Sequence, residues 1–356
     1  MAVTCNKPPP APWLARPRSR VFAHCLTRSN GNTTMPIIAQ SSYHPPRFLT
    51  NPHVQTILPS YMRKRENVNY QRECFNTPDG DFLYLDWSRC GSDCLLILNH
   101  GLCGHSRRHY ILSMVKAFND IGWDCLAWNY RGTSIYDSRL LKFTTNNSTE
   151  ELDWVTRHAI HSGHYRKVAF TGYSMGGNLC LLYLGREAKK LPAEVAGAAV
   201  FCAAIDLKAS AEVMETPVGR LYAKHFLSQM CRMITQKQAY YPDKIDLSHI
   251  DKIETFGDFD KYYTVPLMGF TSPEDYWRQA SAYYWLDDIA VPTLMVNPRN
   301  DPFLAGNCFP QDKAEKNRYL YLEMPESGGH CGFITPGIDQ EWWPTMRAKE
   351  FITALV

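Results

Sequence analysis

The chain has 356 residues, 45% hydrophobic and 21% charged, which is enough to bury the core of one large domain. Its 38 Lys and Arg against 35 Asp and Glu leave a net charge of +3, too small to favour a nucleic-acid partner. The twelve cysteines include no C-x-x-C pair, so no metal site is predicted. Scattered thiols are typical of a reducing compartment such as the cytoplasm.

Residues 1–34 differ in composition from the rest of the chain. They are rich in Pro, Arg and Ser, and the first acidic residue is Glu66. Such a segment resembles an organelle transit peptide. Because it has no clear amphipathic helix, the favoured interpretation is a disordered tail or an extension upstream of a natural start at Met35. We assign residues 1–40 to this extension and residues 41–356 to a single domain.

The apolar pattern predicts a sheet that opens with a hairpin. Residues 68–75 and 81–87 are strand-like, and a turn sequence, Thr77-Pro-Asp-Gly80, separates them. Strand-like and helix-like segments then alternate. Predicted strands cover 94–99, 124–130, 168–171, 193–205, 291–297 and 318–323, and predicted helices cover 109–121, 149–161, 178–184 and 342–355.

This alternation predicts an α/β fold with a mostly parallel sheet and helices on both faces. Functional sites in such sheets lie at the carboxyl ends of the strands. The longest apolar run, residues 195–205, is too short to span a membrane, so no integral membrane segment is predicted. Peripheral membrane contact stays open, and the sequence does not predict an oligomeric state.

The alternation stops at about residues 208–286. This stretch is helical in character and carries 14 aromatic residues between positions 221 and 285. An insertion between strands at this point predicts a helical cap over the site. Its aromatic side chains either line an acyl or lipid pocket or pack the cap against the body. We expect most of them to pack and a minority to line the pocket.

Residues 172–177, Gly-Tyr-Ser-Met-Gly-Gly, follow a predicted strand and precede a predicted helix. That context is a nucleophile elbow, with Ser174 at the apex of a tight, strained turn. A Cβ atom at Gly172 or Gly176 would collide within such a turn. The elbow also presents the N–H of Met175, at the head of the helix, to a developing oxyanion.

A serine nucleophile needs a base within hydrogen-bond reach, and on this fold the chain order is Ser, acid, His. His330 is the predicted base because it lies in a Gly-rich loop after the last strand. Asp301 follows the preceding strand and is the predicted acid, which would fix the imidazole tautomer. Asp206 also follows a strand and stays open as the alternative acid.

The oxyanion hole needs a second N–H, which we expect from the loop His100-Gly-Leu-Cys-Gly104 after the strand at 94–99. The backbone amide of Leu102 is the predicted donor, beside that of Met175. Cys103 in this loop and Cys331 after the base flank the site, where a small buried packing role is the plain interpretation.

These residues resemble the α/β-hydrolase superfamily and, within it, the YheT-like (EMB8-like) esterases, over roughly residues 45 to 350. The resemblance rests on motifs in their order: Asn51-Pro-His-Val-Gln-Thr-Ile-Leu-Pro59, Pro78-Asp-Gly-Asp-Phe82, His100-Gly-Leu102, Asn129-Tyr-Arg-Gly132, Gly172-Tyr-Ser-Met-Gly-Gly-Asn178, Tyr276-Trp-Arg-Gln-Ala-Ser281, Asp301-Pro-Phe303 and Gly328-Gly-His330. It implies a serine hydrolase of carboxylic esters that uses no cofactor, with Ser174 as nucleophile, Asp301 as acid and His330 as base. The family often has Glu where this chain has Cys103.

The expected substrate is a small-molecule ester with a short, medium or lipid acyl group. One alternative is acyl transfer to another alcohol, although no His in this chain has the Asp five positions on that is linked with that activity. Another alternative is a non-catalytic binding protein on the same fold. Such proteins usually lack a triad member, and all three are present here.

Overall fold

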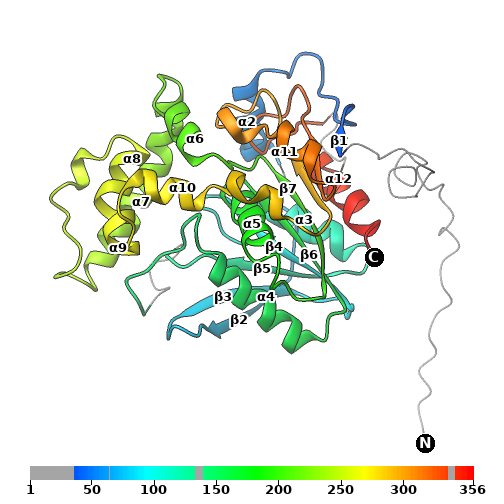
Figure 1. Ribbon diagram of the computed structural model, residues 1–356, viewed down its shortest axis with the longest axis horizontal. Helices are drawn as coiled ribbons and strands as arrows, with labels where there is room; N and C mark the ends of the chain where they lie inside the picture. The colour runs from blue at the N-terminus through cyan, green and yellow to red at the C-terminus, as the bar shows by residue number, and fades with distance from the viewer. Residues whose placement is uncertain (1–35, 64, 133–138, 336–340) are drawn as a thin grey trace, which may run out of the picture. The chain divides into compact units, whose positions relative to one another are not determined.

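The computed structural model describes residues 36–63, 65–132, 139–335 and 341–356. Within these residues the strands form one nine-stranded sheet in the order β1-β9-β8-β7-β6-β4-β5-β3-β2 (Figure 1). The strands are β1 Ile37–Ile38, β2 Gln71–Asn76, β3 Phe82–Ser88, β4 Cys94–Asn99, β5 Asp124–Asn129, β6 Lys167–Tyr173, β7 Val195–Phe201, β8 Thr293–Val296 and β9 Leu320–Glu323.

The sheet is antiparallel at one edge and parallel elsewhere. The predicted hairpin is present: β2 pairs with β3, and β3 pairs with β5, in antiparallel register. From β5 through β4, β6, β7, β8 and β9 to β1, every pairing is parallel. The predicted α/β fold class is therefore confirmed, and the carboxyl ends of the parallel strands share one edge of the sheet.

Helices cover both faces of the sheet. On one face α3 packs against α12, and on the other α4, α5, η3 and α11 pack together. No helix of the described residues is long and apolar enough to cross a membrane. The helices of the body are α2 Pro52–Met62, α3 His109–Asn119, α4 Thr149–Gly163, α5 Met175–Arg186, η3 Ala282–Asp288, η4 Gly306–Cys308, α11 Gln311–Lys316 and α12 Trp343–Thr353.

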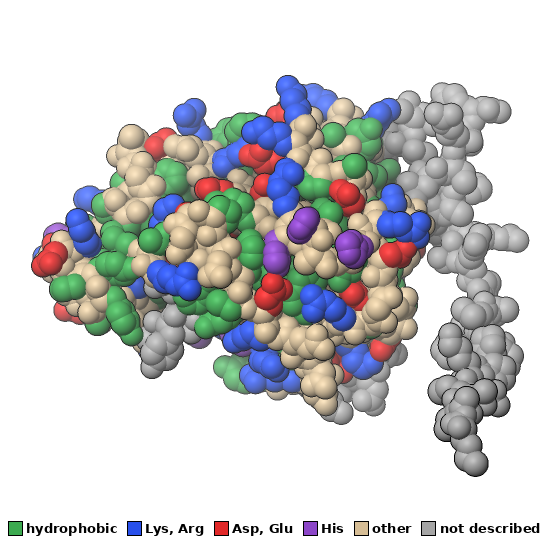
Figure 2. Space-filling view, turned by 90° about the horizontal axis from the view of Figure 1, so that it is seen from below, with side chains coloured by type: hydrophobic (Ala, Val, Ile, Leu, Met, Phe, Trp, Pro, Cys, Tyr) green, Lys and Arg blue, Asp and Glu red, His purple; other side chains and the backbone are tan. Residues whose placement is uncertain are grey.

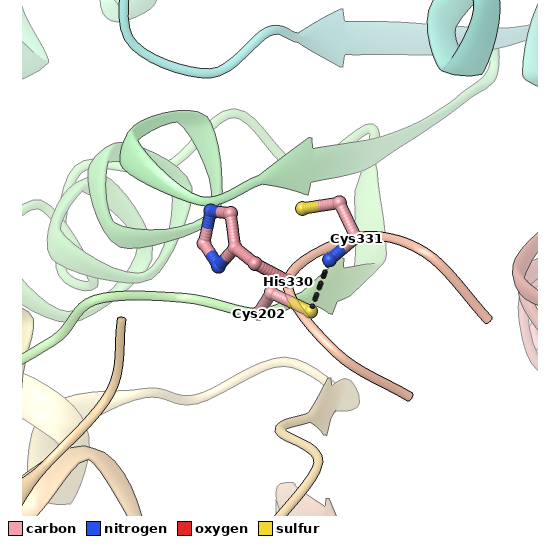
Figure 3. Close-up of side chains that lie close together, drawn as sticks. All are labelled: Cys202, His330 and Cys331. Carbon is pink, nitrogen blue, oxygen red and sulfur yellow. Dashed lines mark hydrogen bonds between the residues drawn. The ribbon is translucent and has the colours of Figure 1, made fainter. Parts of the chain in front are cut away.

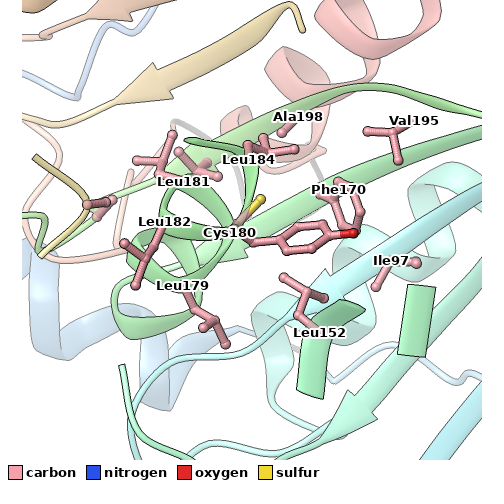
Figure 4. Packing of buried hydrophobic residues seen from close by; sticks show 14 of the residues in the cluster. Ile97, Leu152, Phe170, Leu179, Cys180, Leu181, Leu182, Leu184, Val195 and Ala198 are labelled. Carbon is pink, nitrogen blue, oxygen red and sulfur yellow. The ribbon is translucent and has the colours of Figure 1, made fainter. Parts of the chain in front are cut away.

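Helix α5 lies at the centre of the main core. Every residue from Met175 to Gly185 is buried. Its apolar side chains pack beside Ile97 of β4, Phe170 of β6 and Leu152 of α4 (Figure 4). Removing a large side chain from such a core costs about 2–5 kcal/mol. The helix that follows the elbow is therefore firmly anchored, which fixes the position of Ser174 directly before it.

Four elements of the body were not predicted from the sequence: β1, α2, η4 and α11. Strand β1 pairs with β9, Ile37 opposite Leu322, and so extends the sheet at its edge. Residues 36–40, which the composition assigned to the extension, therefore belong to the α/β body. A two-residue strand is too short to leave a periodic pattern. The rest of the predicted extension, residues 1–35, lies outside the described residues.

The segment between β7 and β8 forms the cap. It comprises α6 Leu207–Met214, α7 Gly219–Gln238, η1 Ile250–Lys252, α8 Phe256–Phe259, the π-helix η2 Asp260–Thr264, α9 Val265–Met268 and α10 Pro273–Ala280. These helices project from the sheet at the left of Figure 1 and have a small core of their own. On the face drawn in Figure 2, charges of both signs are interspersed, and hydrophobic side chains gather over the cap.

Candidate active site

Ser174 occupies the turn between β6 and α5 and has φ 54° and ψ −119°. This region of backbone space is very sparsely populated by residues other than glycine, and such outliers cluster at functional sites. The Ser174 N–H donates to the Phe201 carbonyl of β7 across 3.0 Å, which ties the turn to the sheet. The Ser174 side chain is partly exposed and faces a pocket.

The two glycines of the elbow are required by close backbone approach. A Cβ atom on Gly172 would lie 2.4 Å from the carbonyl oxygen of Gly176. A Cβ atom on Gly176 would lie 2.3 Å from the carbonyl oxygen of Asn99 at the end of β4. In both cases the atom that the Cβ would meet belongs to the backbone, of α5 or of β4, so the steric reason expected from the sequence holds at both positions.

The predicted base and acid are in direct contact. His330 Nδ1 lies 2.9 Å from Asp301 Oδ2 and 3.1 Å from Asp301 Oδ1. The alternative acid, Asp206, is instead the N-cap of α6: its Oδ1 accepts from the Ala209 N–H, and its Oδ2 accepts from the Asn307 side chain. Of the two candidate carboxylates, the structure therefore places only Asp301 on the imidazole.

Helix α2 supports the base loop, a function that sequence reasoning missed. The His330 N–H donates to Thr56 Oγ1 across 2.9 Å. A Cβ atom on Gly332 would lie 1.8 Å from the Gln55 carbonyl oxygen, and one on Gly329 would lie 2.8 Å from the Gln55 Cβ. The glycines around His330 thus let the loop press against α2. The available signal was the Asn51–Pro59 motif, which the sequence analysis used only as a mark of resemblance.

The loop after β4 lies against the elbow because Asn99 pairs with Gly172 in the sheet. In the hydrogen bonds of the described residues, neither the Leu102 N–H nor the Met175 N–H donates to a protein acceptor. The two predicted oxyanion donors are therefore available on adjacent segments. Gly101 approaches the serine so closely that a Cβ atom there would lie 3.5 Å from the Ser174 Cβ.

His100 and two tyrosines fix this predicted oxyanion loop. His100 Nε2 accepts from the Tyr130 N–H at 3.3 Å, so its Nδ1 carries the proton that is donated to the Gly101 carbonyl at 2.8 Å. The Gly101 N–H donates to the Tyr110 hydroxyl oxygen. Burial lowers the pKa of His100 to about 3, so this histidine stays neutral and acts as a structural group.

Two thiols adjoin the base (Figure 3). Burial disfavours the charged form of His330, but Asp301 and Cys331 outweigh it and raise the pKa of the imidazole. Hydrogen bonding with the Cys202 thiol and the proximity of His330 lower the pKa of Cys331. Cys202 was not predicted as part of the site, because it lies 128 positions before His330 in the chain. By contrast, burial raises the pKa of Cys103 to about 12.

Ser174 and His330 open into a pocket of about 370 Å³ between the body and the cap. Four of the 14 aromatic residues between positions 221 and 285 line it and the others do not, which agrees with the expected minority. Its apolar lining includes Leu102, Met175, Met214, Phe226, Met230, Phe256 and Trp277. Phe303 stacks on the His330 ring at 4.1 Å between centroids and also contacts Phe226 of α7, so it links the base to the cap.

A serine on a strand–elbow–helix turn, set at the carboxyl edge of a mostly parallel sheet under a helical cap, defines the class of α/β hydrolases. The chain belongs to the alpha/beta hydrolase fold family, whose model matches residues 95–336. The resemblance predicted from the sequence is thereby confirmed, and the protein is a hydrolase of the esterase and lipase type.

Relatives cover most of the chain. YheT of Escherichia coli is 29% identical over 88% of this chain and 94% of its own length. The human protein named phospholipase ABHD3 is 29% identical over 90% of this chain and 80% of its own. Among solved structures, the esterase Pf2001 of Pyrococcus furiosus aligns with a TM-score of 0.55 at 15% identity, covering 88% of this chain and 99% of that one, which shows the shared fold.

Proposed function

We propose that the protein is a serine esterase that cleaves carboxylic esters through Ser174, His330 and Asp301. One observation carries the proposal: the strained elbow serine and the imidazole of the His330–Asp301 pair line the same pocket. The order Ser, Asp, His along the chain, with each residue in the segment that follows a parallel strand, supports the same assignment.

The proposed reaction has two halves. Ser174 Oγ attacks the ester carbonyl while His330 accepts its proton, and His330 then gives that proton to the departing alcohol. Water attacks the resulting acyl-enzyme with His330 again as base. Asp301 holds the imidazole tautomer and stabilises the imidazolium. The Leu102 and Met175 N–H groups donate to the oxyanion in both halves.

We infer that the acyl group is apolar, because the exposed pocket lining is mainly apolar and includes methionine and aromatic side chains from the cap. The name phospholipase carried by a relative supports a lipid ester as substrate. The ten described cysteines are all free, which supports the expected reducing compartment, the cytoplasm.

The test is labelling with a fluorophosphonate probe, followed by turnover of p-nitrophenyl esters of increasing chain length. Wild type should label and turn over, and Ser174→Ala should lose the label and lower kcat on the order of 10⁶-fold. Ser210→Ala is the matched control, since Ser210 lines the same pocket and should keep its label. A folded wild-type protein with neither label nor turnover would leave a ligand-binding role on this fold.

A further inference from the structure

Three potential metal ligands meet at the proposed catalytic base, His330. The thiols of Cys202 and Cys331 and one imidazole nitrogen of His330 all lie within 4.8 Å of one another (Figure 3). They come from two strand ends: Cys202 follows β7, whereas His330 and Cys331 follow β9. Cys202 is fully buried, and the other two are partly exposed.

The backbone holds both thiols in place. Cys202 has φ 52° and Cys331 has φ 58°, a left-handed conformation that costs a residue with a Cβ atom roughly 1–2 kcal/mol. The Cys331 N–H donates to Cys202 Sγ at 3.1 Å, and the Cys202 thiol donates to the Gly329 carbonyl at 3.6 Å. The two cysteines are therefore fixed relative to each other and to the loop that carries His330.

We propose that Cys202, Cys331 and His330 form a binding site for a thiophilic divalent cation of the Zn²⁺ class. Two thiolates and one imidazole are ligands that Zn²⁺ prefers, and three protein ligands leave the fourth tetrahedral position for water. With Zn–S bonds of about 2.3 Å, the edge of such a tetrahedron is about 3.8 Å. Closing the cluster from 4.8 Å thus needs ligand shifts of about 1 Å.

Binding has a defined proton balance. The cation replaces the protons of two thiols and takes the lone pair of a neutral imidazole, so two thiol protons are released to solvent. Because His330 lines the pocket, the cation and the substrate enter by the same route. A coordinated His330 cannot accept the Ser174 proton, so the cation should inhibit reversibly. This inhibitory consequence rests on the proposed esterase function, whereas cation binding does not.

Binding is measured directly with Cd²⁺, whose thiolate complexes absorb in the ultraviolet, on reduced full-length Ser174→Ala protein that cannot turn over substrate. We expect one charge-transfer site per chain, which Zn²⁺ displaces. Adding Cys202→Ala or Cys331→Ala should weaken it by roughly tenfold or more. Cys103→Ala is the matched control: it removes a thiol that lines the same pocket but lies outside the cluster, and should keep the site.

In protein with Ser174, Zn²⁺ should inhibit ester turnover, with the inhibition constant raised by the same factor in Cys331→Ala, and a chelator should restore the rate. Equal Cd²⁺ absorption by the Ser174→Ala protein with and without Cys331→Ala would overturn the site, as would loss in Cys103→Ala alone. Cys331→Ala decides the question if Cys202→Ala fails to fold, which thermal unfolding reports. Cd²⁺ binding without ester turnover would retain the site and reject the esterase proposal.

Discussion

The two sides of the proposed active site are built in different ways. The serine side comes from six consecutive residues, 172–177, and its geometry depends on backbone packing against β4 and β7. The base side is assembled from three distant segments, which contribute His330, Asp301 and Thr56 through side-chain hydrogen bonds. The geometry of the serine side therefore depends on close backbone packing, and the geometry of the base side depends on hydrogen bonds between polar groups.

The first prediction concerns Asp301, the proposed acid that contacts His330. Asp301→Asn should lower kcat by about 10⁴, because an amide cannot hold the same imidazole tautomer or stabilise the imidazolium. Asp206→Asn should change kcat by less than about tenfold, since Asp206 caps α6 and makes no described contact with His330. Steady-state kinetics on both variants check this, and a larger loss at Asp206 would transfer the acid role to it.

The second prediction tests whether the serine side is steric. Gly176→Ala should lower the free energy of unfolding by about 3 kcal/mol, because its Cβ atom would lie 2.3 Å from a backbone carbonyl oxygen. Gly257→Ala is the control: it is also helical, but its Cβ atom would meet nothing closer than 3.6 Å. Denaturant unfolding measures both, and equal stabilities would contradict the steric account.

The same contrast explains what the sequence could predict. The elbow at Ser174 was found because its residues are contiguous and each glycine has a local reason. Asp301 and His330 were found from chain order and strand ends. The support from Thr56 was not, because a hydrogen bond between residues 274 positions apart leaves no local pattern. Cys202 was missed for the same reason: it follows β7 and Cys331 follows β9, two strands that are far apart in the chain and lie on either side of β8 in the sheet.

The third prediction probes the hidden support of the base. Thr56→Val keeps the shape of the side chain but leaves the His330 N–H without its acceptor, which costs about 1–3 kcal/mol. We expect kcat/KM to fall about tenfold, because the orientation of the imidazole toward Ser174 depends on this loop. Thr235→Val on α7 is the control, since among the described residues its hydroxyl donates to the carbonyl four residues earlier and to no other group, and the change should leave kcat/KM unchanged.

The smallest expected effect is a shift in pH dependence. Because Asp301 and Cys331 outweigh burial and raise the pKa of His330, the acid limb of kcat/KM should lie above the ordinary value of 6.5. His100 contributes nothing to this limb, because burial keeps it neutral down to about pH 3.

The sign for stability follows from the same raised pKa. A histidine that binds its proton more tightly in the folded state adds stability that is fully present below pH 6.5 and is lost as the pH rises through the folded pKa. The difference in unfolding free energy between wild type and Asp301→Asn should therefore shrink as the pH is raised across that range. The contrary result would be an acid limb of kcat/KM below pH 6.5 and a stability difference between wild type and Asp301→Asn that grows with pH. It would mean that burial outweighs Asp301 in setting the pKa of His330, and that packing holds the base side as it holds the serine side.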